Sequence, residues 1–232
     1  NATKMEWDWS TAGKLKDGKP YEEDDADGNH TYLSIKGTFK WGKNLKPDYI
    51  WFNGNAQHYL LGDTISDTTK PLVLNKLLGS YNDKESKIIP VKIHKARQPF
   101  DPVNKMLIQP KLFADKEGEG ALWKDFDWQR ASEVGMKEVN LPYSGKLSFI
   151  NTEMYWPINH MVSSKDSTLK CVDCHTRTDS RIANLKDFYI PGRDYNKYVD
   201  NAGIAIIIAT FVGIGIHGTL RFRSSKKQRR DN

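Results

Sequence analysis

One apolar stretch near the end of the chain limits its fold more than any other feature. Residues 202–220 are 19 consecutive positions without a charged side chain. At about 1.5 Å of rise per residue, a helix of this length spans roughly 28 Å, close to the hydrocarbon thickness of a bilayer. We therefore expect a transmembrane helix over residues 199–221. The alternative is a buried core helix, for which the length and the terminal position are unusual.

Most of the net charge lies directly behind this stretch. The whole chain carries +6, but residues 221–232 hold six basic residues and one acid, which leaves 29 basic and 28 acidic residues in positions 1–220. A basic tail over 222–232 predicts a cytoplasmic C-terminus and a periplasmic body on a single-pass protein of the inner membrane. A nearly neutral body argues against nucleic-acid binding, which needs Lys and Arg spread over one face. The chain begins at Asn1 without a secretory signal, so export implies a processed chain or a fragment.

Both cysteines of the chain lie in the sequence Cys171-Val172-Asp173-Cys174-His175. The C-x-x-C-H spacing is the signature of covalent haem c attachment, because two thiols one helical turn apart add to the haem vinyl groups and the adjacent histidine binds the iron. A thioredoxin-like redox pair would need a strand-to-helix context, and a zinc site would need further Cys or His nearby. We therefore predict one haem c held by Cys171 and Cys174, with His175 as its proximal iron ligand.

Secondary-structure signals before the cysteines are short and varied. Residues 1–45 form a polar N-terminal arm, irregular over 1–30, and residues 32–51 have the pattern of short strands. The runs 88–94 and 106–113 predict a hairpin with a long turn, and residues 120–136 have the clearest helical pattern. We therefore expect a mixed, mainly α fold with much irregular structure and short β-hairpins, in which residues 46–198 form the haem domain.

The acidic run at residues 22–28 resembles the first half of a calcium-binding loop. Its twelfth position would be Ser34, which cannot supply the bidentate carboxylate that such a loop needs. We therefore expect a solvated loop and no calcium.

Three further histidines lie in segments rich in aromatic residues, and in a haem protein such histidines are candidates for axial iron ligands. They are His58, His94 and His160. For the other two, His30 in the acidic arm and His217 in the apolar stretch, we favour ordinary structural roles, with a haem b ligand as the alternative for His217.

The segments around these histidines resemble the octahaem tetrathionate-reductase-type c cytochromes. The likeness extends from about Lys46 to Arg193, through DYIWFNGNAQHYLLGD, KIHKARQPFDPVNKMLIQPKL, WKDFDW, LPYSGKLSF, TEMYWPINHMV, CVDCH and FYIPGRDY. In that family a long chain carries many C-x-x-C-H motifs upstream, and its downstream part ends with a last haem motif and supplies distal histidines to haems attached elsewhere. The resemblance implies that His58, His94 and His160 are such distal ligands. Met161 is the alternative as second ligand of the covalent haem.

The chain departs from that family in two respects, since it lacks the upstream haem motifs and ends in an expected transmembrane helix. We therefore expect a membrane-anchored electron-transfer subunit between a quinone-linked membrane partner and a multihaem cytochrome, with any reductase active site on a partner chain. Integral membrane subunits are expected to pack on the small-residue face of the helix. This face consists of Ala205, Ala209, Gly213 and His217.

Two other functions remain open from the sequence. The first is a single-haem, cytochrome c1-like subunit of a quinol-oxidising complex, which predicts no histidine donated to a partner. The second is a subunit of a sulfur or nitrogen oxyanion reductase. That function would require a cationic pocket at an open haem, for which Lys92, Lys95 and Arg97 are the candidates.

Overall fold

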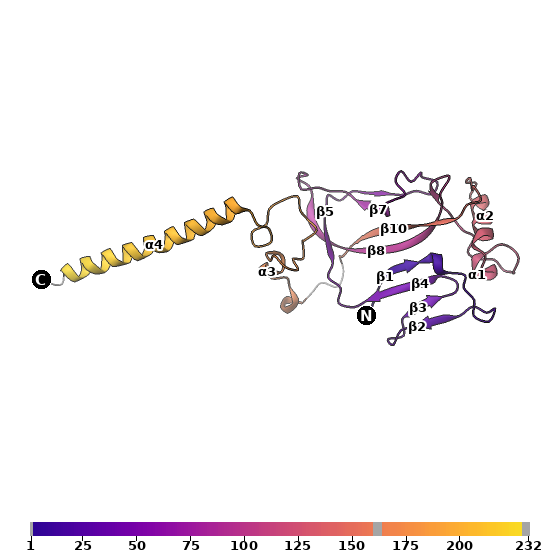
Figure 1. Cartoon of the computed structure of the whole chain (residues 1–232), viewed down its shortest axis with the longest axis horizontal. Coiled ribbons are helices and arrows are strands. Elements are labelled where there is room, and N and C mark those ends of the chain that lie inside the picture. The colour runs from indigo at the N-terminus through magenta and orange to yellow at the C-terminus, as the bar shows by residue number, and fades with distance from the viewer. Residues whose placement is uncertain (1, 160–163, 229–232) are drawn as a thin grey trace. The chain divides into compact units, whose positions relative to one another are not determined.

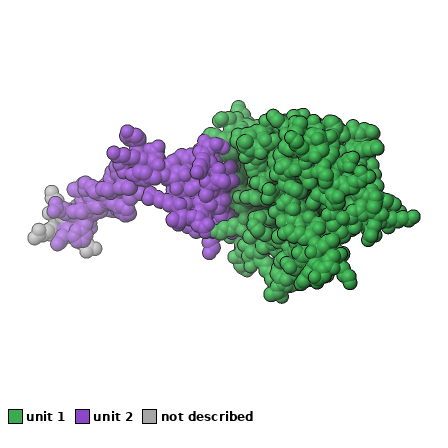
Figure 2. Space-filling model, turned by 45° about the vertical axis from the view of Figure 1, so that its right-hand side comes forward, with its two compact units in different colours: residues 1–168 green, residues 169–232 purple. Residues whose placement is uncertain are grey.

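The computed structural model describes residues 2–159 and 164–228 (Figure 1). The chain divides into two compact units, residues 1–168 and residues 169–232 (Figure 2). Helix accounts for 25% of the chain and strand for 29%, so the expected mixed fold is confirmed and the expectation of a mainly α fold is wrong. The difference arises because the strands of the first unit pair across long sequence separations, which local patterns do not reveal.

A mixed ten-stranded sheet forms the first unit. Eight strands follow the order β2-β3-β4-β1-β8-β10-β7-β6, and β5 and β9 pair with β8 outside this path. The β1–β8 and β10–β7 pairs are parallel, and the other pairs are antiparallel. The strands are β1 (Thr3–Asp8), β2 (Glu22–Asp24), β3 (His30–Leu33), β4 (Gly37–Gly42), β5 (Asp48–Phe52), β6 (Ala56–His58), β7 (Leu72–Leu77), β8 (Lys87–Asp101), β9 (Met106–Leu107) and β10 (Ser148–Pro157).

Strand β8 organises the sheet. It runs for 15 residues and lies beside β10 along its length (Figure 1). On its other edge β8 pairs with two strands in succession. The pairing with β5 ends at Val91, and the pairing with β1 begins at Lys95. The predicted hairpin is confirmed through the pairing of β8 with β9, but its turn is shorter than expected. Prolines in this segment predict a strand end, yet β8 continues through Pro99. On this edge Pro99 lies between the end of the β1 pairing at Arg97 and the start of the β9 pairing at Phe100.

The N-terminal residues are not the irregular arm that the sequence predicts. Strand β1 lies inside the sheet between β4 and β8, and β2 pairs with β3. The period-two alternation of charged Lys4, Glu6 and Asp8 with apolar neighbours is the overlooked signal. The Lys4 ammonium lies 4.0 Å from the centroid of the Phe39 ring, so even this charged side chain packs on the sheet. After β2 the acidic run turns on Asp25, whose carboxylate accepts the backbone N–H groups of Asp27 and Asn29, each at 2.9 Å.

The predicted helix at residues 120–136 is confirmed in two parts, α1 (Leu122–Asp125) and α2 (Trp128–Glu138). Phe126 separates them, because it adopts the left-handed conformation with φ of 54°. Asp127 then caps α2 by accepting the Arg130 N–H at 3.0 Å. Helix α2 packs through Met136, which is fully buried. A short 3₁₀ turn, η1 (Trp9–Thr11), follows β1.

Gly135 allows α2 to contact the chain that follows β9. A Cβ atom there would lie 2.1 Å from the Gln109 carbonyl oxygen and 2.4 Å from the Lys111 nitrogen, both backbone atoms. We expect Gly135→Ala to lower the free energy of unfolding by about 2 kcal/mol, although alanine favours helix. Chemical denaturation measures this change, with the exposed Lys137→Ala on the same helix as the control. A Gly135→Ala protein as stable as the control would contradict this close approach.

The second unit consists of α3 (Cys171–Cys174), a loop, and α4 (Lys197–Gln228); the turn η2 (Lys165–Ser167) precedes it. Within the described residues, α4 is the one helix long and apolar enough to cross a membrane, and the rest of the protein buries none of its apolar window. The helix predicted at residues 199–221 is therefore present, and it continues into the basic tail.

Candidate functional site

The C-x-x-C-H segment forms one helical turn. The Lys170 N–H donates to the Asp173 carboxylate at 2.6 Å, which starts α3. The His175 N–H donates to the Cys171 carbonyl oxygen at 2.9 Å, which places His175 at the end of the turn. Both thiols are free, and that of Cys171 is exposed. The turn follows η2 rather than a strand, so the context of a thioredoxin-like redox pair is missing.

The imidazole of His175 is held in one tautomer. Its Nδ1 atom lies 2.7 Å from the Pro191 carbonyl oxygen. A carbonyl oxygen can only accept a hydrogen bond, so Nδ1 carries the proton and the lone pair is left on Nε2. Metal-binding histidines are oriented by this kind of bond from the other ring nitrogen. His175 therefore presents Nε2 as an iron ligand.

A buried arginine organises the loop that carries Pro191. The Arg193 side chain is only 6% exposed. Its guanidinium donates to the carbonyl oxygens of Ile182, Leu185 and Phe188, and to the carboxylate of Asp194 at 2.5 Å. The bonds from Arg193 to this carboxylate, and after them the N–H of Ile190, hold the pKa of Asp194 below its ordinary value. The bonds of Arg193 thus hold the loop in one conformation, and they also hold the Pro191 carbonyl oxygen that orients His175.

Gly192 brings the loop backbone onto His175. Its φ is +84°, and a Cβ atom there would lie 2.9 Å from the His175 carbonyl oxygen. No motif for haem binding singles out Arg193, Gly192 or Pro191 in the sequence. The compact order Pro-Gly-Arg-Asp is the signal that marks a constrained turn at this place.

The sheet aligns two of the predicted histidines. His58 pairs with Asn75, Asn75 with Met154, and Met154 with His94. These four residues form one row across β6, β7, β10 and β8, which we call the histidine row. At about 4.8 Å between neighbouring strands, the two histidine Cα atoms are roughly 14 Å apart.

Asn75 fixes the register of the histidine row. Its Nδ2 donates to the Tyr155 carbonyl oxygen and its Oδ1 accepts the Tyr155 N–H, both at 2.6 Å. The pairing of β7 with β10 shifts register between Glu153 and Met154. There the Asn75 side-chain amide makes the two hydrogen bonds that a backbone group would otherwise make. No local sequence signal marks this role.

His58 and Met154 line a cavity of about 410 Å³ on one face of the sheet. Met154 lies directly opposite His94, so His94 projects from the same face. The rim is apolar, with Trp156 50% exposed and Leu61 55% exposed. The two histidines and this apolar surface form a face suited to a flat, hydrophobic ligand.

The surroundings of His94 disfavour a positive charge on its imidazole. Burial lowers the pKa of His94, and the positive charges of Lys92 and Lys4 lower it further. The neutral imidazole is the form that binds iron.

Neither His30 nor His217 belongs to the histidine row. His160, and with it Met161, lies outside the described residues. His30 is exposed and its Nδ1 lies 2.6 Å from the Asp24 carboxylate, as an ordinary surface pair. His217 is exposed on α4.

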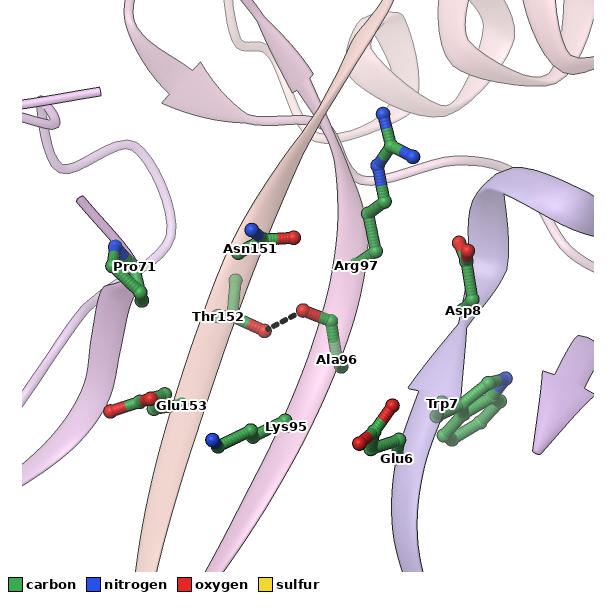
Figure 3. A pocket seen from close by; sticks show the side chains of 10 residues that line it. All are labelled: Glu6, Trp7, Asp8, Pro71, Lys95, Ala96, Arg97, Asn151, Thr152 and Glu153. Atoms are coloured by element: carbon green, nitrogen blue, oxygen red, sulfur yellow. Dashed lines mark hydrogen bonds between the residues drawn. The ribbon is translucent and has the colours of Figure 1, made fainter. Parts of the chain in front are cut away.

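The three candidate cations do not converge. Lys95 and Arg97 line a cavity of about 440 Å³ over β1, β8 and β10, together with the carboxylates of Glu6, Asp8 and Glu153 (Figure 3). Lys92 is an odd number of positions away on the same strand, so it projects from the opposite face. The cavity holds three carboxylates against two cations, which is unfavourable for an oxyanion substrate.

Comparisons with known proteins agree with this geometry. A family model of bacterial cytochrome c matches residues 4–178. The chain belongs to the bacterial cytochrome c family. The match includes the C-x-x-C-H turn and both described members of the predicted histidine set. As a member of this family, the chain is a haem protein of electron transfer, and the family implies covalent haem c.

Among solved structures, the chain is similar to octahaem cytochrome c from Shewanella oneidensis. The sequence identity is 39%, the TM-score is 0.73, and the match covers 84% of this chain and 44% of that chain. The chain therefore spans less than half the length of that cytochrome. The expected likeness to an octahaem cytochrome is confirmed, and the tetrathionate-reductase type stays a prediction. A comparison with curated proteins finds no match.

The residues of the second unit fit a covalent haem c. Two free thiols one turn apart can form the thioether bonds, and His175 offers Nε2 to the iron. Apolar surface for a porphyrin lies exposed beside the turn, with Leu169 48% and Val172 65% exposed. In the part of the chain that the structure describes, no three or more His, Cys, Asp or Glu side chains are grouped so that they could hold a metal ion. A haem does not need such a group, because its porphyrin supplies four of the iron ligands.

Proposed function

We propose that this cytochrome c is a membrane-anchored subunit that passes electrons between a quinone-linked membrane partner and a multihaem cytochrome. Its haem is held by Cys171 and Cys174, with His175 as the proximal ligand. The fixed tautomer of His175 is the observation that carries this assignment. A covalently bound haem c supplies one-electron exchange at its iron.

His58 and His94 are proposed as distal ligands of haems carried by the multihaem partner. Their alignment in the histidine row supports this role, since two imidazoles on one face and roughly 14 Å apart can serve two separate irons. The chain has one C-x-x-C-H motif, so further haems must be attached outside it. His160 is proposed for the same role from the sequence alone. Histidine on both sides of an iron gives low-spin haem suited to electron transfer.

The membrane anchor is proposed to be α4. Its length, its apolar surface and the basic residues behind it support a single span with the C-terminus in the cytoplasm and the body in the periplasm. The small-residue face of Ala205, Ala209, Gly213 and His217 is the proposed contact with an integral membrane subunit.

A cytochrome c1-like subunit is the second candidate, favoured by the single haem motif next to a membrane helix. It assigns only structural roles to the histidine row. A reductase subunit is disfavoured, because Lys92 is separated from Lys95 and Arg97 by the sheet and the latter two face carboxylates.

The distal-ligand proposal is tested by His58→Ala and His94→Ala in the assembled native complex. We expect each change to convert one haem from a low-spin to a high-spin spectrum and to shift the redox titration of that haem, because one axial ligand is lost. Visible absorption spectra during potentiometric titration measure both effects. His30→Ala is the matched control and is expected to change neither. If His58→Ala and His94→Ala both behave like His30→Ala, the c1-like subunit is the better description.

A further inference from the structure

The first turn of α4 is tied to the loop that holds the haem histidine. Asn196 caps the helix, since its Oδ1 accepts the N–H groups of Tyr198 at 3.0 Å and Val199 at 3.2 Å. One carboxylate oxygen of Asp200 accepts the Asn196 N–H at 2.7 Å. The other accepts the hydroxyl of Tyr189 at 3.1 Å. Asp200 therefore joins the helix cap to the loop.

The same loop contacts His175 close to this junction. Two residues beyond Tyr189, the Pro191 carbonyl oxygen accepts the Nδ1 proton of His175. Gly192 lies against the His175 backbone, and the four residue steps from Gly192 to Asn196 can extend at most about 14 Å. Two connections therefore keep His175 close to the N-terminal end of α4. One is the hydrogen bond of Tyr189 to Asp200, and the other is the short chain from Gly192 to Asn196.

Three tyrosines surround this junction, and we call them the tyrosine collar. Tyr189 is 36% exposed, Tyr195 63% and Tyr198 84%. Tyrosine is enriched where a protein meets the membrane–water interface, because its ring is apolar and its hydroxyl is polar. The Arg177 guanidinium lies 5.4 Å from the centroid of the Tyr195 ring, which adds a positive charge for lipid phosphate.

We propose that the tyrosine collar lies in the lipid headgroup region of the periplasmic leaflet and that the Tyr189–Asp200 bond fixes the haem of His175 in one orientation at the membrane surface. The three tyrosines lie in the first turn of α4 and in the loop before it. If α4 crosses the membrane, their rings therefore lie at the membrane–water interface. The proposed binding partner of the tyrosine collar is the lipid surface. This inference rests on the proposed haem attachment and membrane span.

The orientation is tested on the full chain with its covalent haem, in oriented multilayers of phosphatidylcholine. Electron paramagnetic resonance of the ferric haem is recorded against the angle of the multilayer in the field. The wild-type spectrum is expected to depend strongly on this angle. Asp200→Ala and the conservative Tyr189→Phe are expected to lose most of that dependence, because both remove the bond between loop and helix. Asp187→Ala, an exposed carboxylate of the same loop, is the control and should keep it.

The lipid contact is tested with phosphatidylcholine that carries a spin label on its headgroup. The ferric haem of the wild type is expected to speed the spin relaxation of this label several-fold, because ferric haem relaxes faster than a spin label. Tyr195→Ser with Tyr198→Ser should remove most of the enhancement. A chain that binds vesicles and haem but shows no angular dependence, or no enhancement, overturns the inference alone. A chain without covalent haem, or one that does not float with vesicles, overturns the proposed function instead.

Discussion

Replacing Cys171 and Cys174 together by alanine is expected to remove all covalent haem from the chain. In the proposed attachment each thiol forms one thioether bond, and a single replacement leaves one point of attachment, so the double variant is expected to give the largest loss. Haem staining of the chain after denaturing electrophoresis and the intact mass of the polypeptide measure this change. The mass should fall by one haem beyond the change in side chains.

Val172→Ala is the matched control, because Val172 lies in the same turn and is 65% exposed but offers no thiol. It should keep full haem staining. Haem that stays bound to the double variant through denaturation would place the attachment elsewhere. The chain has no other cysteine, so such a result would also contradict a thioether bond.

The helical turn of the C-x-x-C-H segment could be predicted because its sequence pattern is local. Two cysteines three positions apart fall one helical turn apart, and the next residue ends that turn whatever the rest of the chain does. The support of the turn could not be predicted in the same way. Pro191 contacts His175 from 16 positions away. Arg193 holds that loop through backbone carbonyls, which leave no pattern in a sequence.

The extent of the sheet cannot be predicted from local patterns for a related reason. Strand β1 pairs in parallel with β8 through Glu6 and Lys95, which are 89 positions apart in the sequence. A three-residue strand such as β6 (Ala56–His58) has no periodicity to detect, and its partner β7 supplies the hydrogen bonds. Helix α4 and the helical segment at residues 120–136 were found because their signals span many residues.

The histidine row shows what these long-range pairs add to function. The sequence singles out His58 and His94 one at a time, by their aromatic neighbours. Their alignment comes from the pairing of Asn75 with β10, a contact across 80 positions. A slip of this register by one residue would turn one histidine to the opposite face of the sheet. The alignment of the two proposed haem ligands therefore depends on Asn75, which is not itself a proposed ligand.

The far end of β8 depends on a buried carboxylate. Asp101 is 0% exposed. Its oxygens accept the N–H groups of Val103 at 2.9 Å and Asn104 at 3.0 Å in the β8–β9 turn, and the N–H and hydroxyl of Ser144, each at 2.7 Å, from the segment before β10. Burial by itself would raise the pKa of Asp101, but the hydrogen bonds from Asn104, Ser144 and Val103 outweigh it and hold the pKa below its ordinary value.

We expect Asp101→Ala to lower the free energy of unfolding by about 4 kcal/mol, because it leaves several buried donors without an acceptor. The loss should depend on pH. A carboxyl whose pKa is lower in the folded chain stabilises fully above its unfolded pKa of about 3.9, and that contribution fades as the pH falls through the folded pKa. Denaturant titrations at pH 7 and at pH 3 should therefore show a smaller difference between wild type and variant at the lower pH.

Two comparisons separate this role from a general effect of charge. Asp115→Ala removes an exposed carboxylate and is expected to leave stability within about 0.5 kcal/mol of wild type at both pH values. Haem staining of Asp101→Ala should match wild type, because the C-x-x-C-H turn and its supporting loop belong to the second unit. An equal loss of stability at pH 7 and pH 3 would mean that the pKa of Asp101 is the same in the folded and the unfolded chain. A larger loss at pH 3 would mean that the folded chain holds the carboxyl protonated, so that its hydrogen bonds are those of a neutral acid.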